Sequence, residues 1–389
     1  MIIRPAIVLA FLLGVPVPAL AEPYVPAGDA VVLEQLPGRD TPDYRNLKRL
    51  RGQAEAAPGD VAKAVELADA YYRVSRREGD PRYLGYAQAA LMRWWDDTAA
   101  PVPVLVTRAT ILQSAHEFPR ALADLDRAIA GDPGNARAIL VRATVHGVVG
   151  NHGQAEADCG RLLGLTQDTY VIGCAAGVAA VTGNARQAAA ALERTVAQRP
   201  GLEPETRAWF SSLLAEIAER QGDPVAERHF RQSLEADPSD LYTLAAYCDW
   251  LLAENRPADV VDLLRDQQRV DGLLLRLALA QTALGSPAAK DAITTLKARY
   301  AASHMRGDTV HRREEARFQL ALAGDAKQSL RLARENWEVQ REPADLRILA
   351  EAAKATGDAA ASQTVRQWLT STGLEYPAVA ALVKAEGAK

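Results

Sequence analysis

The chain has 389 residues, of which 48% are hydrophobic and 24% charged, and its formal net charge is −4. This balance is typical of a folded globular chain, so intrinsic disorder is disfavoured. A mildly acidic chain lacks the basic surface that phosphate backbones require, which disfavours nucleic acid as the main partner. Its three cysteines are too few for a disulfide-stapled scaffold.

Residues 1–21 have the pattern of a secretory signal peptide. Arg4 precedes an apolar run over residues 6–15, and the small-x-small sequence at 19–21 predicts cleavage after Ala21. The apolar run is about ten residues long, whereas a membrane span needs roughly 20, which disfavours a retained anchor. We expect the mature chain to be exported, periplasmic and soluble, without a membrane span.

Residues 22–43 are predicted to form an extended arm, because prolines interrupt them at positions 23, 26, 37 and 42. The remainder, 44–389, is predicted to be one helical repeat array. A helix is expected over residues 42–57 ahead of the first repeat, and another over 376–386 after the last.

Two stretches of the chain align without a gap at a spacing of 34 residues, so that the pairs 108/142, 109/143, 110/144, 121/155, 124/158 and 127/161 are identical. A wider pattern places a small residue, two large apolar residues and a proline four residues apart. It occurs at 121–133, 188–200 and 226–238. This spacing describes one buried helix face that ends at a proline.

The pattern resembles the tetratricopeptide repeat family, whose unit is a helical hairpin of 34 residues with small residues where its two helices cross. Ala109 and Ala143 fall at the small position of the family's first helix. The alanine of the second helix is matched at Ala121, Ala155, Ala188 and Ala226. The family's Trp and Tyr of the first helix are mostly aliphatic here.

Glycine followed by Asp or Asn separates the apolar segments at several points, as expected where one helix ends and the next is capped. These turns predict nine hairpins, which begin near Val61, Val102, Ala136, Thr169, Pro204, Asp240, Gly272, Asp308 and Pro343. The clearest repeats cover 102–239. The predicted fold is therefore all-α, a right-handed superhelical solenoid of about nine tetratricopeptide-like hairpins with capping helices.

Motifs for catalysis are missing from the sequence. It contains no phosphate loop, no nucleophile elbow, no H-E-x-x-H and no C-x-x-C. The histidine pairs at 146/152 and 304/311 lack the spacing of metal ligands on one helix face. We therefore predict no enzymatic activity, no cofactor and no metal. Four tryptophans at helical positions are expected to anchor hairpin interfaces: Trp209, Trp250, Trp337 and Trp368.

Cys159 and Cys174 are placed on neighbouring helices of the predicted stack, the second helix of one hairpin and the first of the next. In an exported protein these helices could be joined by a disulfide. The alternative is that both are small core residues, because free cysteine packs well in apolar surroundings. Cys248 would remain a free thiol in either case.

In proteins that resemble this one, the first helices line a concave groove that holds segments of other proteins. The resemblance places six residues on that inner wall: Val106, Thr110, Gln113, Arg137, Leu140 and Thr144. The Lys and Asn with which some relatives clamp a terminal carboxylate are absent there. The leading hypothesis is an exported, non-catalytic scaffold or adaptor for protein partners. Alternatives are a periplasmic assembly or maturation chaperone, or an accessory subunit of an envelope polysaccharide or transport system, within a membrane-associated complex.

Overall fold

The computed structural model describes residues 26, 28, 30–31 and 41–384. The chain divides into two units, Met1–Arg45 and Asn46–Lys389. The expected signal peptide and nearly all of the expected arm lie outside the described residues, so both stay predictions. The first helix, α1 (Pro42–Glu55), begins at the end of the first unit.

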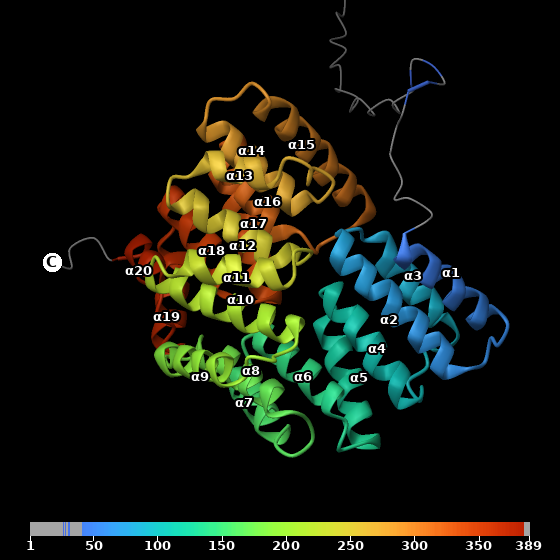
Figure 1. Cartoon of the computed structure of the whole chain (residues 1–389). Helices are drawn as coiled ribbons and strands as arrows, with labels where there is room; N and C mark the ends of the chain where they lie inside the picture. Colours follow the sequence, from blue (N-terminus) through green and yellow to red (C-terminus); the bar gives the residue numbers. More distant parts are fainter. Residues whose placement is uncertain (1–25, 27, 29, 32–40, 385–389) are drawn as a thin grey trace, which may run out of the picture. The chain divides into compact units, whose positions relative to one another are not determined.

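The second unit is an all-α stack of nine helical hairpins, and the described residues contain no β-strand (Figure 1). The first helices of the hairpins are α2 Val61–Glu78, α4 Val102–Ser114, α6 Ala136–Val148, α8 Asp168–Ala179, α10 Pro204–Gln221, α12 Leu241–Ala253, α14 Asp271–Ala283, α16 Arg312–Phe318 and α18 Pro343–Thr356. The second helices are α3 Arg82–Ala90, α5 Phe118–Gly131, α7 His152–Arg161, α9 Ala185–Gln198, α11 Ala226–Ala236, α13 Pro257–Leu263, α15 Ala289–Arg306, α17 Ala326–Val339 and α19 Ala359–Thr372. A short helix, α20 (Pro377–Leu382), follows the last hairpin.

Eight of the nine predicted hairpin starts agree with the structure to within one residue. The eighth hairpin begins at Arg312, four residues later than expected, because α15 runs on to a left-handed Gly307 and a connection follows it. Within that hairpin a five-residue π-helix, η2 (Gln319–Ala323), separates α16 from α17. Helix α1 stops at Glu55, two residues early, because the residue before Pro58 is disfavoured in a helix.

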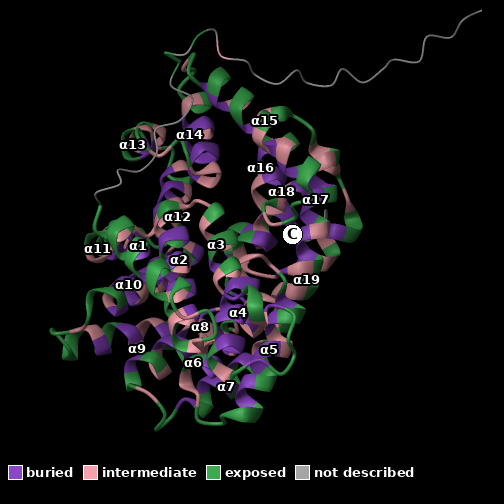
Figure 2. Cartoon of the chain, turned by 90° about the vertical axis from the view of Figure 1, so that its right-hand side faces the viewer, coloured by how far each residue is buried: buried purple, intermediate pink, exposed green. Residues whose placement is uncertain are grey.

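The repeated small and apolar positions form the core, as expected. In α5, Ala121 and Leu125 are fully buried and Ile129 nearly so. The equivalent alanines of α7, α9 and α11 are buried as well, which allows the two helices of each hairpin to approach closely. Every hairpin therefore has a buried side toward its neighbours and an exposed side (Figure 2). No helix in the described part of the chain is both long and apolar enough to cross a bilayer.

The predicted turn glycines are confirmed, whereas the predicted side-chain caps are found at some turns and not at others. The glycines that follow the first helices adopt a positive φ, and Asp325 and Asp358 accept hydrogen bonds from the amides of Gln328 and Ala361, at 2.9 and 2.8 Å. Asn151 and Asn184 precede α7 and α9 without a capping hydrogen bond from their side chains. The expectation of Asn caps at these two turns was therefore wrong.

The 34-residue repeat of Arg and Asp forms buried ion pairs inside two successive hairpins. Arg108 of α4 meets Asp124 of α5 through two hydrogen bonds of 2.6 and 2.7 Å. Arg142 and Asp158 repeat this arrangement between α6 and α7, at 2.7 and 2.5 Å. These pairs lie between the two helices of a hairpin, so their recurrence reflects how a hairpin is held together.

Candidate binding surfaces

Helix α4 presents little of the expected inner wall. Every residue from Val104 to Leu112 is buried, with Val106 at 2% and Thr110 at 6% exposure. The Thr110 hydroxyl donates a hydrogen bond of 2.9 Å to the carbonyl of Val106 within the helix. Both side chains are therefore part of the core in this conformation and offer no accessible surface to a partner.

The other predicted wall residues remain accessible in part. Arg137 and Thr144 of α6 are exposed, and Leu140 between them and Gln113 at the end of α4 are partly buried. Arg137 donates two hydrogen bonds, of 2.7 and 2.8 Å, to the carboxylate of Asp69 on α2, and these bonds raise the pKa of Arg137. Asp69, which the sequence did not single out, thus joins α2 to α6 across α4.

The turns of the first hairpins contact hairpins much later in the chain. The turn between α2 and α3 meets the starts of α12 and α14, so that a Cβ on Gly79 would lie 2.8 Å from Val270 and 2.9 Å from Leu241. The next turn holds His116 at a φ of 57°, near Arg313 of α16. Burial, assisted by Arg313, lowers the pKa of His116 to about 4.

The third and fourth turns contact the last hairpin. A Cβ on Gly150 would lie 2.5 Å from the indole of Trp368 on α19, and the amide of Arg341 donates to the carbonyl of Val148 at 2.7 Å. Gly183, with a φ of 79°, lies against the backbone of Gly373, with a φ of 73°. A Cβ on Gly183 would be 3.3 Å from the carbonyl oxygen of Gly373, so both turns need glycine for this approach.

The end of α10 meets the same part of the chain through polar groups. The hydroxyl of Tyr376 donates to Glu219 at 3.1 Å, and the amide of Gln221 donates to Glu375 at 2.9 Å. Arg347 of α18 lies 3.5 Å from the Glu219 carboxylate. Burial raises the pKa of Glu219, and Arg347 opposes that shift. This contact is polar, unlike the apolar packing between successive hairpins.

A second polar cluster connects α16, α17 and the start of α18. Arg313 lies 3.6 Å from Glu342 and 3.5 Å from Asp345, which also accepts hydrogen bonds from Asn336 and Gln340. Burial and the neighbouring Asp345 raise the pKa of Glu342 to about 7. The cluster contains no nucleophile placed beside a base, and its groups hold the hairpins together.

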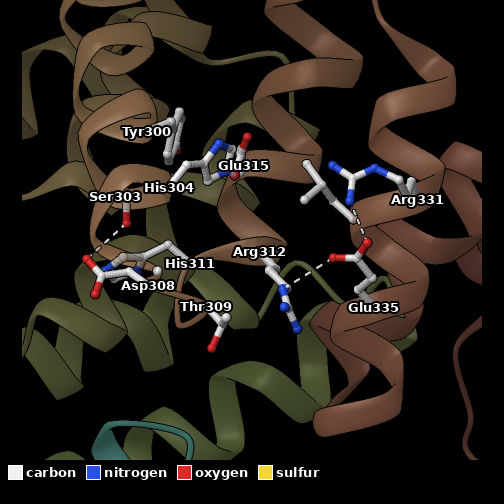
Figure 3. A pocket seen from close by; sticks show the side chains of 12 residues that line it. Tyr300, Ser303, His304, Asp308, Thr309, His311, Arg312, Glu315, Arg331 and Glu335 are labelled. Atoms are coloured by element: carbon white, nitrogen blue, oxygen red, sulfur yellow. Dashed lines mark hydrogen bonds and ion pairs between the residues drawn. The ribbon is translucent and has the colours of Figure 1, made fainter.

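A cavity of about 300 Å³ lies between α15, α16 and α17 (Figure 3). Its charged side chains largely pair with one another: His304 with Glu315 at 2.8 Å, and Arg331 with Glu335 at 2.5 Å. Asp308 accepts a hydrogen bond of 3.2 Å from Ser303. Across the described residues, no group of three or more His, Cys, Asp or Glu side chains is arranged to hold a metal ion.

The two cysteines singled out in the sequence come together. Cys159 of α7 and Cys174 of α8 are joined by a disulfide, with Cα atoms 5.5 Å apart, and Cys248 is a buried free cysteine. Burial raises the pKa of Cys248 to about 12, which leaves its thiol protonated and unreactive near neutral pH. The disulfide links the third hairpin to the fourth.

The stacked hairpins and the alanines at their crossings define a tetratricopeptide-like α-solenoid. No family model and no curated protein matches the sequence. Among solved structures, the human IFIT1 dimer with m7Gppp-AAAA is similar at 12% identity and a TM-score of 0.47, over 88% of this chain and 87% of that one.

Two further structures are similar at lower scores. A tetratricopeptide repeat protein from Parabacteroides merdae has 11% identity and a TM-score of 0.37, over 85% of this chain and 99% of its own. Yeast Tom70 has 9% identity and a TM-score of 0.28, over 86% and 85% of the two chains. Similarity at these values identifies no ligand and no partner for this chain.

Proposed function

We propose that this protein is an exported, periplasmic, non-catalytic scaffold or adaptor that binds protein partners on the inner surface of its first helices. The observation that carries the proposal is the accessible strip on α6, where Arg137 and Thr144 are exposed beside the half-buried Leu140. The proposed strip combines a charge held in place by Asp69, an apolar side chain and a hydroxyl on one rigid helix. Such a preformed surface loses little conformational freedom on binding.

The sequence supports the proposed export of the chain and the proposed type of partner. The pattern of residues 1–21 supports export, and the net charge of −4 favours protein over nucleic acid. Because Val106 and Thr110 are buried, we restrict the proposed contact residues to Gln113, Arg137, Leu140 and Thr144. A chaperone for exported clients and an accessory subunit of an envelope machine use the same surface and differ in what they hold.

The test is crosslinking of the tagged protein in cells, followed by mass spectrometry of the captured proteins. Thr144→Glu should reduce capture of a dedicated partner at least about tenfold, since it places a charge in the proposed contact. Thr294→Glu on α15 is the matched control, because Thr144 and Thr294 are both exposed and both donate to the carbonyl four residues earlier. Capture that is equal for the two variants would contradict the proposed surface.

The identity of the captured proteins separates the alternatives. One stoichiometric partner supports the adaptor, and a component of a membrane-bound machine supports the accessory role. Many unrelated exported proteins would instead indicate a holding chaperone. Retention on a polysaccharide column, without captured protein, would overturn the protein-binding proposal.

A further inference from the structure

The last two hairpins and α20 contact the ends of α6, α8 and α10 through a small set of groups, in addition to the packing of α16 and η2 on α14 and the ion pair of Arg317 with Asp249. We name residues 312–382 the C-terminal lobe, and its contacts with Val148, Gly150, Gly183, Glu219 and Gln221 the seam. The seam consists of one main-chain hydrogen bond, two glycine approaches, one indole and a few polar side chains. Apolar contact across it includes Val339, which packs on the first core, and Val181, which packs on the last.

The lobe is attached to the hairpin before it through α14, on which α16 and η2 pack, and hardly through α15. In the described chain, the second helix of each other hairpin packs directly on the first helix of the next, whereas α15 and α16 hardly touch. The cavity of about 300 Å³ occupies the space between them (Figure 3). Phe318 packs against Tyr300 in a tilted arrangement with ring centroids 5.4 Å apart, and Leu322 packs on the same core.

The connection between α15 and the lobe starts at a glycine with open space beside it. Gly307 ends α15 at a φ of 75°, and no described atom outside its neighbours lies within 4 Å of the position of a Cβ there. The following residues, 308–311, are outside any helix and mostly exposed. A hinge requires such a short segment together with free space beside it, and the cavity supplies that space.

We infer that the C-terminal lobe is a self-docked occupant of the inner surface and swings about residues 307–311 to open the seam. In the open state the ends of α6, α8 and α10 become accessible to a helical hairpin of another protein. That partner would place an aromatic ring on Gly150 and an amide on the carbonyl of Val148, as the lobe does in the closed state. The identity of such a partner rests on the proposed function, whereas the opening itself does not.

The opening is tested with alanine substitutions at glycines that share a left-handed conformation. Gly150→Ala and Gly183→Ala insert a methyl group into the seam, while Gly222→Ala introduces the same local strain at a φ of 72° with open space around it. Hydrogen exchange of the Arg341 amide, which donates across the seam, is measured for each. We expect exchange at least about tenfold faster in the seam variants than in Gly222→Ala.

Tyr376→Phe provides a second variant that introduces no backbone strain, because it removes only the hydroxyl, which hydrogen-bonds to Glu219 and Arg347. It should accelerate exchange at Arg341 about threefold to tenfold while residues 104–112 of α4 keep their protection. Equal exchange in Tyr376→Phe, in the seam variants and in the wild type would overturn the inferred opening.

Capture in cells separates this inference from the proposed function. If the lobe competes with the partner, Gly150→Ala should increase crosslinked partner relative to Gly222→Ala. If both capture the same amount, the partner does not use the seam surface and the competition is refuted, although the adaptor role stands. If neither the wild-type protein nor a variant captures a partner, the proposed function fails. The hydrogen-exchange result still decides whether the seam opens.

Discussion

Buried charges of the hairpins are tolerated because each Arg has a carboxylate with matching geometry. The side chains of Arg108 and Asp124 are only 4% and 5% exposed and form a buried ion pair. Arg108 also donates to the carbonyls of Trp94 and Trp95, and Asp124 also accepts from Arg127. Asp124→Ala should lower the free energy of unfolding by about 3 to 5 kcal/mol, since it leaves the Arg108 charge buried without its partner. Urea denaturation followed by circular dichroism measures the change.

Asp126 is the matched control for this substitution. It lies two residues away on the same helix and pairs with Arg142 at 2.7 Å, but its side chain is 63% exposed. Asp126→Ala should change the free energy of unfolding by no more than about 1 kcal/mol. A loss of similar size in both variants would show that burial does not determine the contribution of these pairs.

His116 should make stability depend on pH. The pKa of His116 is lowered to about 4 by burial and by Arg313, against an ordinary value of 6.5. As the pH falls below 6.5, His116 of the unfolded chain binds a proton, whereas His116 of the folded chain stays neutral until about pH 4. The free energy of unfolding therefore decreases over that interval. His116→Asn keeps a residue that tolerates positive φ and removes the titration.

The comparison of wild type with His116→Asn isolates this effect. From pH 7.5 to pH 5 the wild type should lose about 2 kcal/mol of unfolding free energy relative to the variant. Denaturation curves at the two pH values give the difference. Parallel pH dependence in both proteins would show that His116 is protonated equally in the folded and unfolded states.

The inner wall marks the limit of what single positions in the sequence reveal. Positions 106 and 110 were placed correctly on the first helix of their hairpin, and yet both are buried. Their burial is a property of the folded stack, which a repeat pattern at a spacing of 34 does not contain. The Arg108 and Asp124 pair, by contrast, was already visible as a repeated spacing, although its role was not read from it.

Among the elements, α8 shows how closely two first helices can approach. Gly173 of α8 is buried under the indole of Trp209 on α10, with Phe210 2.9 Å from the position of its Cβ. Gly173→Ala should lower the free energy of unfolding by about 1 to 3 kcal/mol through overpacking. In Gly177→Ala, four residues along the same helix, the methyl group meets Leu213 at an ordinary 3.9 Å.

Gly177→Ala should therefore stabilise the protein, by about 0.5 to 1 kcal/mol, because alanine favours a helix over glycine. Thermal denaturation of the two variants measures effects of opposite sign. Stabilisation by both would mean that α8 and α10 can separate without loss, and would remove the close contact as a determinant of this interface.

The link between α7 and α8 is open to a chemical test. With Cys159 and Cys174 bonded, denatured and unreduced protein purified from the oxidising compartment should have one reactive thiol, that of Cys248. Three thiols should appear after reduction. Three reactive thiols before reduction would exclude the disulfide in the mature protein.

The positions of the helices were predictable because a repeat recurs at a fixed spacing along the sequence. The turn glycines and the apolar spacing located the hairpins, including those after residue 240 for which turns were the main signal. The start of α16 was missed because α15 is longer than its equivalents and a connection follows it. The π-helix η2 (Gln319–Ala323) also had no signal in the turn and apolar pattern.

Within the second unit, the first hairpins of the stack contact the later ones, and we call this contact closure. It results from a small rotation that each hairpin adds to the one before. The rotation is set by side-chain packing at every interface, so its sum over nine hairpins is not readable from any one of them. Its result is regular: the turns at residues 79, 150 and 183 contact the second half of the stack, and His116 in the remaining turn of the first four hairpins lies near Arg313. Each of these residues has a positive φ.

Closure predicts that residues far apart in the sequence unfold together. In an open solenoid the terminal hairpin frays without affecting the middle of the chain. Here Trp368 joins α19 to Gly150, so Trp368→Ala should reduce hydrogen-exchange protection both in α19 and in residues 147–151, by about tenfold at each. Exchange measured on peptides from both regions tests the coupling.

Val365→Ala distinguishes coupling through the seam from simple loss of stability in α19. Val365 lies in α19, the same helix as Trp368, and is fully buried. It belongs to the last core together with Trp337 and is not part of the seam. Its truncation should weaken protection in α19 and leave residues 147–151 unchanged. If Val365→Ala exposed those residues as strongly as Trp368→Ala does, the two halves would unfold as one cooperative unit, and the seam would not be a separable contact.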